Sequence, residues 1–319
     1  MAAKDWRGAS DRGGWRERAG AGKAAPRAEG GWSARRDRNH ERAEQRYRLR
    51  LAAGVLTILA LIAGFIAYLV FIPVRTPLLV MAATDYRPPV PPNGWVQEDL
   101  AKLATLDRKE TVKFITIPWQ SSQQGLRELQ MRLDATRPGG PGKDVVMLYL
   151  SMHGLVNGEG EPCLLPPGAS PLDSTTWLPL RSLLDSLFLQ DRPGKPKDST
   201  KKLLILDCTR LDCEWRIGLL AGGFAERLPR IVESMAIPNL LVLSASGPGQ
   251  VAHAAPALRG SAFAHFLWQG LDGAADKEKS GNSDGRVTLK ELHSYLDAQV
   301  GQWAIENRFD SQHPMLLPE

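Results

Sequence analysis

Two stretches of the chain decide its fold: DVVMLYLSMHG at residues 144–154 and KLLILDCTR at residues 202–210. Each contains a continuous apolar run of the kind that forms a strand covered on both faces of a sheet. Each run then changes abruptly to polar residues. Because ligands and active sites gather at the carboxyl ends of parallel strands, the pair predicts a buried sheet with a functional edge.

The chain from residue 77 onward repeats this pattern, with short apolar runs between amphipathic segments. Such alternation predicts a three-layer α/β sandwich around a mostly parallel sheet. The expected strands are Leu78–Ala83, Val112–Ile117, Asp144–Met152, Lys202–Asp207 and Asn239–Ala245. The expected helices are Val96–Leu106, Gln123–Ala135, Leu178–Leu189, Leu219–Met235, Ser261–Ala275 and Leu289–Asn307.

Residues 51–72, LAAGVLTILALIAGFIAYLVFI, contain no charged side chain. As a helix, these residues span roughly 33 Å, which is enough to cross the hydrocarbon core of a bilayer. A buried core helix fits less well because no polar face interrupts the run. A cleaved signal peptide also fits less well because the run is too long and the basic region before it too large. The segment is therefore predicted to be a transmembrane helix.

Residues 1–50 contain 14 Lys and Arg against 7 Asp and Glu, which is a net charge of +7. With few aliphatic residues to bury, this tail is expected to be disordered. The whole chain carries +5, so the remainder carries −2, and no nucleic-acid partner is expected. Trp6, Trp15 and Trp32 lie among the arginines of the tail, where RNA or anionic lipid is an alternative to a solvated segment.

The flanks of the apolar run predict its orientation in the membrane. Arg42, Arg46, Arg48 and Arg50 precede the run, whereas Arg75 alone follows it closely. The positive-inside rule then places the tail in the cytoplasm and residues 73–319 on the exoplasmic side, as a periplasmic or extracellular domain.

A cysteine-nucleophile site is the chemistry that the two polar strand ends suggest. His153 follows the first strand and Cys208 follows the second, so an imidazole could hold the proton of an attacking thiolate. Gly154 leaves its amide free to approach a developing oxyanion. Other parallel-sheet families fit less well, because the chain has no GxGxxG after its first strand, no GxxxxGK[ST] and no GxSxG. The three cysteines, Cys163, Cys208 and Cys213, form no disulfide framework, although one pair could close.

Several segments in order carry a resemblance to a known family. They are the His-Gly after VVMLYL, LLILD, NLLVLSASGPGQ, GSAFAHFLWQGLDGAAD, DGRVTLKELHSYL and QHPML. Residues 77–319 resemble the caspase/metacaspase cysteine peptidases, and bacterial caspase-like domains in particular. The resemblance implies a caspase-hemoglobinase fold, with His153 as the general base and Gly154 lining the oxyanion hole.

The sequence departs from that family at the nucleophile. The family usually has Asp, a small residue and then Cys, whereas this chain has Asp207, Cys208 and Thr209, so that Thr209 occupies the nucleophile's place. Because side chains alternate along an extended segment, a thiol moved by one position turns to the other face. An alcohol is also far less ionised than a thiol.

The sequence is compatible with two functions. One is a membrane-anchored cysteine endopeptidase using His153 and Cys208, with Asp207 in a substrate pocket that favours cleavage after Arg or Lys, as the resemblance implies. The other is a degenerate domain that binds a peptide or protein partner without hydrolysing it. Asp207 also has a simpler interpretation, as a carboxylate that holds the strand end or a loop amide.

A loop before the last helix has the spacing of a weak EF-hand. Asn282, Asp284, Gly285 and Glu291 match its positions 3, 5, 6 and 12, which makes Ca²⁺ a candidate ligand of the side chains of Asn282, Asp284 and Glu291. Ser280 replaces the usual first Asp, which weakens the match. The alternative is an Asx turn followed by a capping box from Thr288 to Glu291.

Overall fold

The computed structural model describes residues 33–71, 75–86, 88–108, 112–119, 122–136, 145–191, 193, 195, 197–211, 222–279 and 281–318. The chain divides into two compact units, residues 1–72 and residues 73–319. Cys213, Ser280 and most of the tail therefore lie outside the described residues.

The first unit contains one long helix, α1 (Ser33–Phe71). It includes residues 33–50, which the sequence predicted to be disordered. Arg, Ala, Glu and Gln favour helix, and an ion pair joins Glu44 to Arg48 one turn later at 3.8 Å, so the helix extends from the apolar run into the basic segment. Within α1, Glu44–Ile66 is long and apolar enough to cross a membrane, with a hydropathy of 2.3.

The second unit is built on a six-stranded sheet with the order β11-β8-β7-β3-β1-β2. All its neighbours are parallel except β11 and β8, which are antiparallel. The strands are β1 (Thr76–Ala82), β2 (Val112–Thr116), β3 (Val145–Ser151), β7 (Lys201–Asp207), β8 (Leu240–Ser244) and β11 (Met315–Leu317). Five of these match the predicted strands within two residues at either end, and the mixed, mostly parallel sheet agrees with the expected fold class.

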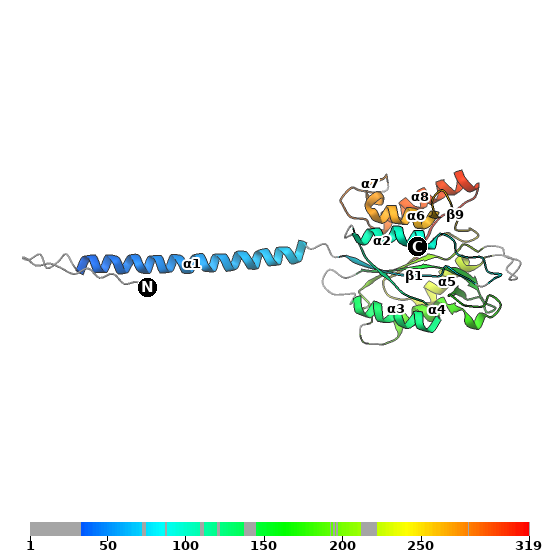
Figure 1. Ribbon diagram of the computed structural model, residues 1–319, viewed down its shortest axis with the longest axis horizontal. Coiled ribbons are helices and arrows are strands. Elements are labelled where there is room, and N and C mark those ends of the chain that lie inside the picture. Colours follow the sequence, from blue (N-terminus) through cyan, green and yellow to red (C-terminus); the bar gives the residue numbers. More distant parts are fainter. Residues whose placement is uncertain are drawn as a thin grey trace, which may run out of the picture. The chain divides into compact units, whose positions relative to one another are not determined.

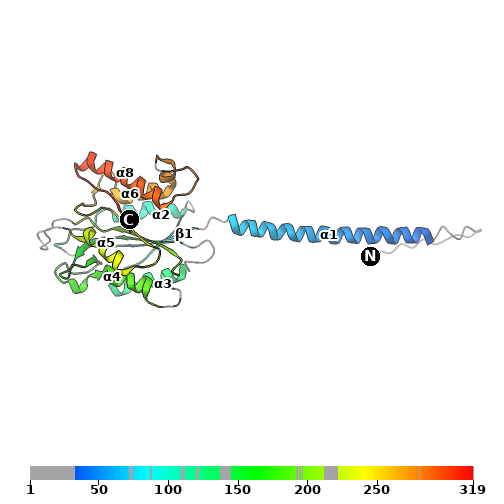
Figure 2. The same cartoon turned by 180° about the vertical axis from the view of Figure 1, so that it is seen from behind.

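Helices cover both faces of this sheet, which gives three layers (Figures 1 and 2). One apolar layer lies between the sheet and α3, α4 and α5, and the other between the sheet and α2, α6 and α8. The helices are α2 (Val96–Arg108), α3 (Ser122–Thr136), α4 (Leu180–Leu184), α5 (Phe224–Met235), α6 (Ala262–Gln269), α7 (Ala275–Lys277) and α8 (Leu289–Arg308). The π-helical turns η2 (Asp185–Leu189) and η4 (Gly270–Ala274) extend α4 and α6.

A second, three-stranded sheet lies beyond the carboxyl end of β3. It has the order β4 (His153–Val156), β5 (Pro162–Leu165) and β6 (Leu178–Pro179), with antiparallel neighbours. A two-stranded ribbon, β9 (Ala254–Ala255) with β10 (Gly260–Ser261), lies before α6. The start of the predicted helix Leu178–Leu189 is therefore strand, because Leu178 pairs with Leu164 of β5. A single residue, Met152, separates β3 from β4, which fixes His153 at the junction of the two sheets.

Candidate functional site

The carboxyl ends of the central strands bring the predicted site residues to one edge of the sheet. Ser151, the last residue of β3, pairs with Asp207, the last residue of β7. His153 starts β4 two residues after Ser151, and Cys208 and Thr209 follow Asp207. The Gly154 N–H donates to the Cys208 carbonyl at 2.8 Å, which joins the two chain segments directly.

The Cys208 side chain points into the apolar layer under α3, α4 and α5. It is fully buried there, together with Leu150, Met152 and Leu206. Its Sγ donates to the Leu150 carbonyl at 3.5 Å. Burial raises the pKa of the Cys208 thiol well above its usual range, and the charge of Asp207 raises it further.

The side chains of Asp207 and Thr209 form hydrogen bonds that do not involve the Cys208 thiol. Asp207 is hydrogen-bonded to Tyr149, whose ring belongs to the other apolar layer. The Thr209 hydroxyl is buried and accepts a hydrogen bond from Ser246 Oγ at 2.7 Å. Cys208 continues the alternation of side chains along β7, because Leu206 and Cys208 belong to one apolar layer and Asp207 contacts Tyr149 of the other.

His153 is held by contacts that do not involve the thiol. Its Nε2 lies 2.8 Å from the Pro91 carbonyl, and its ring stacks on Tyr86 with centroids 4.6 Å apart. His153 is 2% exposed, and in the described part of the chain its Nδ1 has no hydrogen-bond partner. Burial lowers the His153 pKa to about 4, and the nearby Arg210 contributes in the same direction, against the Pro91 hydrogen bond and the charge of Asp207. At neutral pH the imidazole is therefore uncharged.

Gly154 is required by close packing. A Cβ on this residue would lie 2.6 Å from Cγ of Phe224 and 2.8 Å from the Cys208 carbonyl oxygen. Its N–H, which the sequence assigned to an oxyanion hole, donates to that same carbonyl. In this structure the amide therefore holds the two strand ends together.

Asp207 anchors a buried polar cluster that the sequence did not predict. Its Oδ2 accepts hydrogen bonds from Tyr149, from Ser261 Oγ at 2.9 Å and from Arg210 Nη2 at 2.9 Å. Arg210 also donates to Asn93 Oδ1 at 2.6 Å and to the Gly94 carbonyl at 2.9 Å. The only signal in the sequence is that Arg210 follows Asp207 by three residues.

Asp99, from α2, completes the cluster. Its Oδ2 accepts the Ser261 N–H at 3.0 Å and lies 3.5 Å from Arg210 Nη2. Burial raises the Asp99 pKa to about 7, and the charge of Asp207 adds to the rise, whereas the Ser261 N–H and the charges of Arg210 and Lys102 oppose it. Two carboxylates from distant parts of the sequence thus share one guanidinium.

The backbone of this chain is similar to that of a solved caspase structure. Caspase-1 from Spodoptera frugiperda matches with a TM-score of 0.50 and 13% sequence identity, over 76% of this chain and 86% of that chain. The second unit has a caspase-like fold. No protein-family model matches the chain, and no curated protein matches it. At this identity the likeness concerns the path of the backbone.

The backbone amides of the EF-hand-like loop form hydrogen bonds to side chains, and these hydrogen bonds hold the loop in place. Asp276, the middle residue of α7, accepts the N–H groups of Asp284 and Gly285 at 3.0 and 2.9 Å. Asn282 accepts the Asp284 N–H at 2.9 Å, and Glu291 forms a capping box with Thr288 at the start of α8. Among the described residues, no group of three or more His, Cys, Asp or Glu is placed to hold a metal ion. The cation site stays a prediction.

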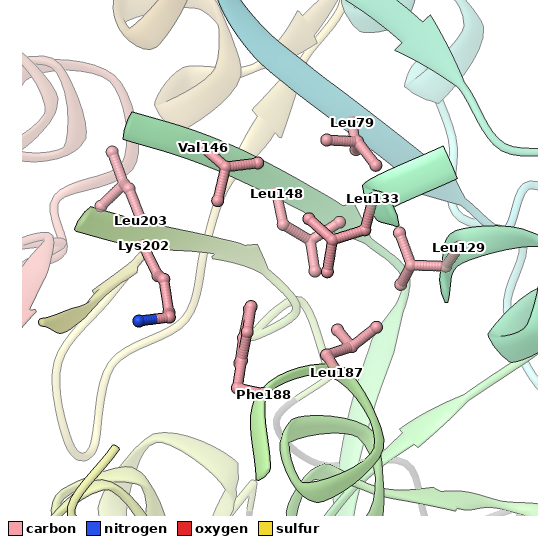
Figure 3. Close-up of a pocket in the computed structure, with 9 residues that line it drawn as sticks. All are labelled: Leu79, Leu129, Leu133, Val146, Leu148, Leu187, Phe188, Lys202 and Leu203. Atoms are coloured by element: carbon pink, nitrogen blue, oxygen red, sulfur yellow. The ribbon is translucent and has the colours of Figure 1, made fainter. Parts of the chain in front are cut away.

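A small apolar cavity lies in the core, away from these strand ends (Figure 3). Its lining includes Val146 and Lys202, which are at the amino-terminal ends of β3 and β7. The Lys202 ammonium donates to the Thr200 and Pro238 carbonyls at 2.9 and 2.8 Å, so it caps the sheet. The cavity is a packing defect of the core on the side opposite to the candidate site.

A shallow hollow lies at the edge of the central sheet where the parallel strands have their carboxyl ends. It is lined by Thr209, Leu211, Gly222, Phe224, Ala225, Glu226, Gly249 and Gln250. The Gly249 N–H donates to Glu226 Oε1 at 2.8 Å, which ties the loop after β8 to the first turn of α5. Cys208 is not among the lining residues, whereas Thr209 is.

Proposed function

We propose that residues 73–319 form a caspase-like domain that binds a protein or peptide partner without hydrolysing it. The observation that carries this proposal is the burial of the Cys208 thiol in the apolar layer, where it donates to the Leu150 carbonyl. A nucleophile must ionise and must reach its substrate. The buried position of Cys208 opposes both.

The groups around Cys208 support the same proposal. His153 Nε2 is engaged with Pro91, and the Gly154 N–H is engaged with the Cys208 carbonyl. Thr209 lines the hollow and Cys208 does not, and the Thr209 hydroxyl accepts a hydrogen bond from Ser246 Oγ. Catalysis by Cys208 would therefore require the strand end, the imidazole and the glycine amide all to rearrange. A partner that docks in the hollow needs none of these changes.

A cysteine endopeptidase is the second candidate, and the caspase-like fold favours it. In this alternative, His153 is the general base, Cys208 is the nucleophile and Gly154 lines the oxyanion hole. Asp207 would favour cleavage after Arg or Lys, as in the family that the sequence resembles. The strand end after Asp207 would have to change its path so that the sulfur approached the imidazole.

The apolar helix supports a membrane location for the domain. Glu44–Ile66 has the length and hydropathy of a span, and its large apolar side chains from Leu51 to Ile66 are about half exposed or more. The arginines before this helix favour a cytoplasmic tail and an exoplasmic domain. This orientation is part of the proposal.

Covalent capture distinguishes the two candidates. The full chain in detergent is treated with a peptidyl-arginine chloromethylketone, and adducts are located by mass spectrometry beside the Cys208→Ala variant. We expect no Cys208 adduct and no cleavage of Arg- or Lys-containing peptides by either protein. A Cys208 adduct together with a peptidase activity that Cys208→Ala abolishes would overturn the proposal in favour of the endopeptidase.

A further inference from the structure

One loop of the caspase-like domain is closed on itself beside His153. It contains residues 84–86 and 88–95, lies between β1 and α2, and is here called the strap. The Asn93 N–H donates to the Thr84 carbonyl at 3.1 Å, so the two ends of the strap are tied together. Compact surface loops whose ends lie close are frequently functional. The strap therefore forms one unit of the domain, next to the candidate site.

The strap covers the imidazole of His153. Its Pro91 carbonyl lies 2.8 Å from His153 Nε2, and its Tyr86 ring stacks on the imidazole with centroids 4.6 Å apart. The Tyr86 hydroxyl accepts the His153 N–H at 3.0 Å and donates to the Leu165 carbonyl at 2.9 Å. Because His153 and Leu165 are opposite each other in β4 and β5, this one hydroxyl pins the strap to both strands.

Oxygen atoms of the strap occupy hydrogen-bond donors at both strand ends. A carbonyl can only accept a hydrogen bond, so His153 Nε2 carries a proton and donates it to Pro91. Arg210 Nη1 donates to Asn93 Oδ1 at 2.6 Å and to the Gly94 carbonyl at 2.9 Å. While the strap is in place, these donors are therefore engaged within the chain and closed to a second molecule.

The strap has a small apolar anchor and a strained end. Val90 packs in a small cluster apart from the two layers of the sheet, with Leu155, Leu165, Ala169 and Leu211. Trp95, directly before α2, has a φ of 69°, in the left-handed region that L side chains rarely adopt. Such strain costs free energy and is typical of switch regions. His153 Nδ1, which has no hydrogen-bond partner in the described part of the chain, adds a second cost of closure.

We propose that the strap is a conformational switch: it opens as a unit, hinged at Trp95 and pinned by Tyr86, and uncovers the imidazole of His153. A small anchor and a strained hinge allow this opening while the layered core stays folded. Cys208 remains in its apolar layer in both states. The switch goes beyond the proposed function and does not rest on it, because the strap covers His153 whether or not Cys208 hydrolyses a peptide bond.

Amide hydrogen exchange of the wild-type full chain in detergent tests the opening, with single-residue resolution by mass spectrometry. Two adjacent amides report on it differently: the His153 N–H is bonded to Tyr86 of the strap, whereas the Gly154 N–H donates to the Cys208 carbonyl. We expect the amides of Asn93 and His153 to exchange at similar rates, at least about 10-fold faster than that of Gly154. Equal exchange at His153 and Gly154 would overturn the proposal, because the strap would then be part of the rigid domain.

Removal of one oxygen atom tests the pin. Tyr86→Phe keeps the ring that stacks on the imidazole and removes the hydroxyl that bonds to β4 and β5. Tyr295→Phe is the matched control, because its hydroxyl is also part-buried but is bonded to Gln269 in the other apolar layer. We expect Tyr86→Phe to speed exchange at Asn93, whose own hydrogen bond it leaves intact, by a further factor of at least about 10. Tyr295→Phe should leave that rate unchanged.

Labelling with diethyl pyrocarbonate at pH 7, which acylates imidazoles that solvent reaches, links the opening to His153. We expect His153 to be labelled at least about 5-fold faster in Tyr86→Phe than in the wild type. His313, whose side chain is 48% exposed, is the internal reference and should be labelled equally in both.

The proposal requires both effects of Tyr86→Phe. Faster exchange at Asn93 without faster labelling of His153 would show that the strap moves without uncovering the imidazole. Faster labelling without faster exchange would show that the strap does not move as a unit, and no change in either would show that Tyr86 is not the pin. Each of these results overturns the proposal. Because no measurement uses a peptide substrate or the Cys208 thiol, such a failure is separate from a failure of the proposed function.

Discussion

At the scale of single residues, the side-chain alternation of β7 decides which group reaches the candidate site. Leu206 and Cys208 face the layer under α3, α4 and α5, whereas Asp207 faces Tyr149 in the other layer. A shift of one residue would exchange these faces. The chemistry of the edge therefore depends on the register of Asp207, Cys208 and Thr209 more than on the presence of a cysteine.

Gly154 offers a test of how tightly the two strand ends are packed. A methyl group at this position would overlap Phe224 and the Cys208 carbonyl. We expect Gly154→Ala to lower the free energy of unfolding by about 1–3 kcal/mol, as overpacking does. Urea unfolding measures this change. In Gly158→Ala, where a Cβ meets no atom within 4 Å, we expect a change within about 0.5 kcal/mol. Equal effects of the two substitutions would contradict this packing.

His153 gives the domain a defined dependence on pH. Its pKa is lowered from 6.5 to about 4 by burial, so between these values the unfolded chain binds more protons than the folded one. Stability must then fall as the pH drops from about 6.5 towards 4, by at most about 1.4 kcal/mol per pH unit. We expect His153→Gln to lack this slope in urea unfolding measured across that range.

The pKa shift of Asp99 changes the stability in the opposite direction as the pH varies. Its pKa is raised from 3.8 to about 7, so its contribution to stability is greatest below pH 3.8 and is lost as the pH rises towards 7. Both proteins in the His153 comparison retain Asp99, so the difference between their curves isolates the imidazole. Parallel curves for wild type and His153→Gln would contradict the burial of a neutral His153.

At the scale of elements, the hydrogen bonds of the loop before α8 predict how the protein responds to Ca²⁺. The Glu291 carboxylate accepts the N–H and the hydroxyl of Thr288, both at 2.8 Å, and Asp276 holds the amides of the loop. With these oxygens engaged, we expect millimolar Ca²⁺ to leave the melting temperature of the EDTA-treated protein unchanged, with Mg²⁺ as the control. A rise with Ca²⁺ that Glu291→Gln abolishes would instead establish the predicted cation site.

The elements differ in how far the sequence could predict them. The central strands were predictable because runs such as VVMLYL are apolar on both faces. The short strands β4, β5, β6 and β11 were missed because two to four residues are too few for a periodic pattern. The helix over residues 33–50 was not predicted, because the tail has few aliphatic residues to bury and disorder was expected for that reason.

Only those residues of the candidate site that directly follow a predicted strand could be placed from the sequence. His153, Cys208 and Thr209 could be placed because each follows a recognisable strand. The pairing of Arg210 with Asn93 and Asp99 joins residues 117 and 111 positions apart, and no local pattern contains that information. The direction of the thiol relative to Thr209 stays a prediction from the spacing, because alternation is a local property of the strand.

At the scale of the whole molecule, the sidedness of the protein can be measured. With Arg42, Arg46, Arg48 and Arg50 before the apolar run, we expect the tail to be cytoplasmic. In sealed vesicles of inside-out orientation, added protease should remove the tail and leave residues 73–319 protected. Right-side-out vesicles are the control and should give the reverse pattern. Digestion of the domain in inside-out vesicles, with the tail protected, would contradict the orientation.

The reactivity of the Cys208 thiol tests the central claim most directly. The full chain is alkylated with iodoacetamide with and without urea, and the rate at Cys208 is followed by mass spectrometry. We expect native Cys208 to react at least about 100-fold more slowly than the unfolded chain, because access requires opening of the packed layer. Thr209→Cys in a Cys208→Ala background, which places a thiol at the hollow, should react faster than native Cys208. Rapid labelling of native Cys208 that His153→Ala abolishes would contradict the account and identify a working cysteine–histidine pair.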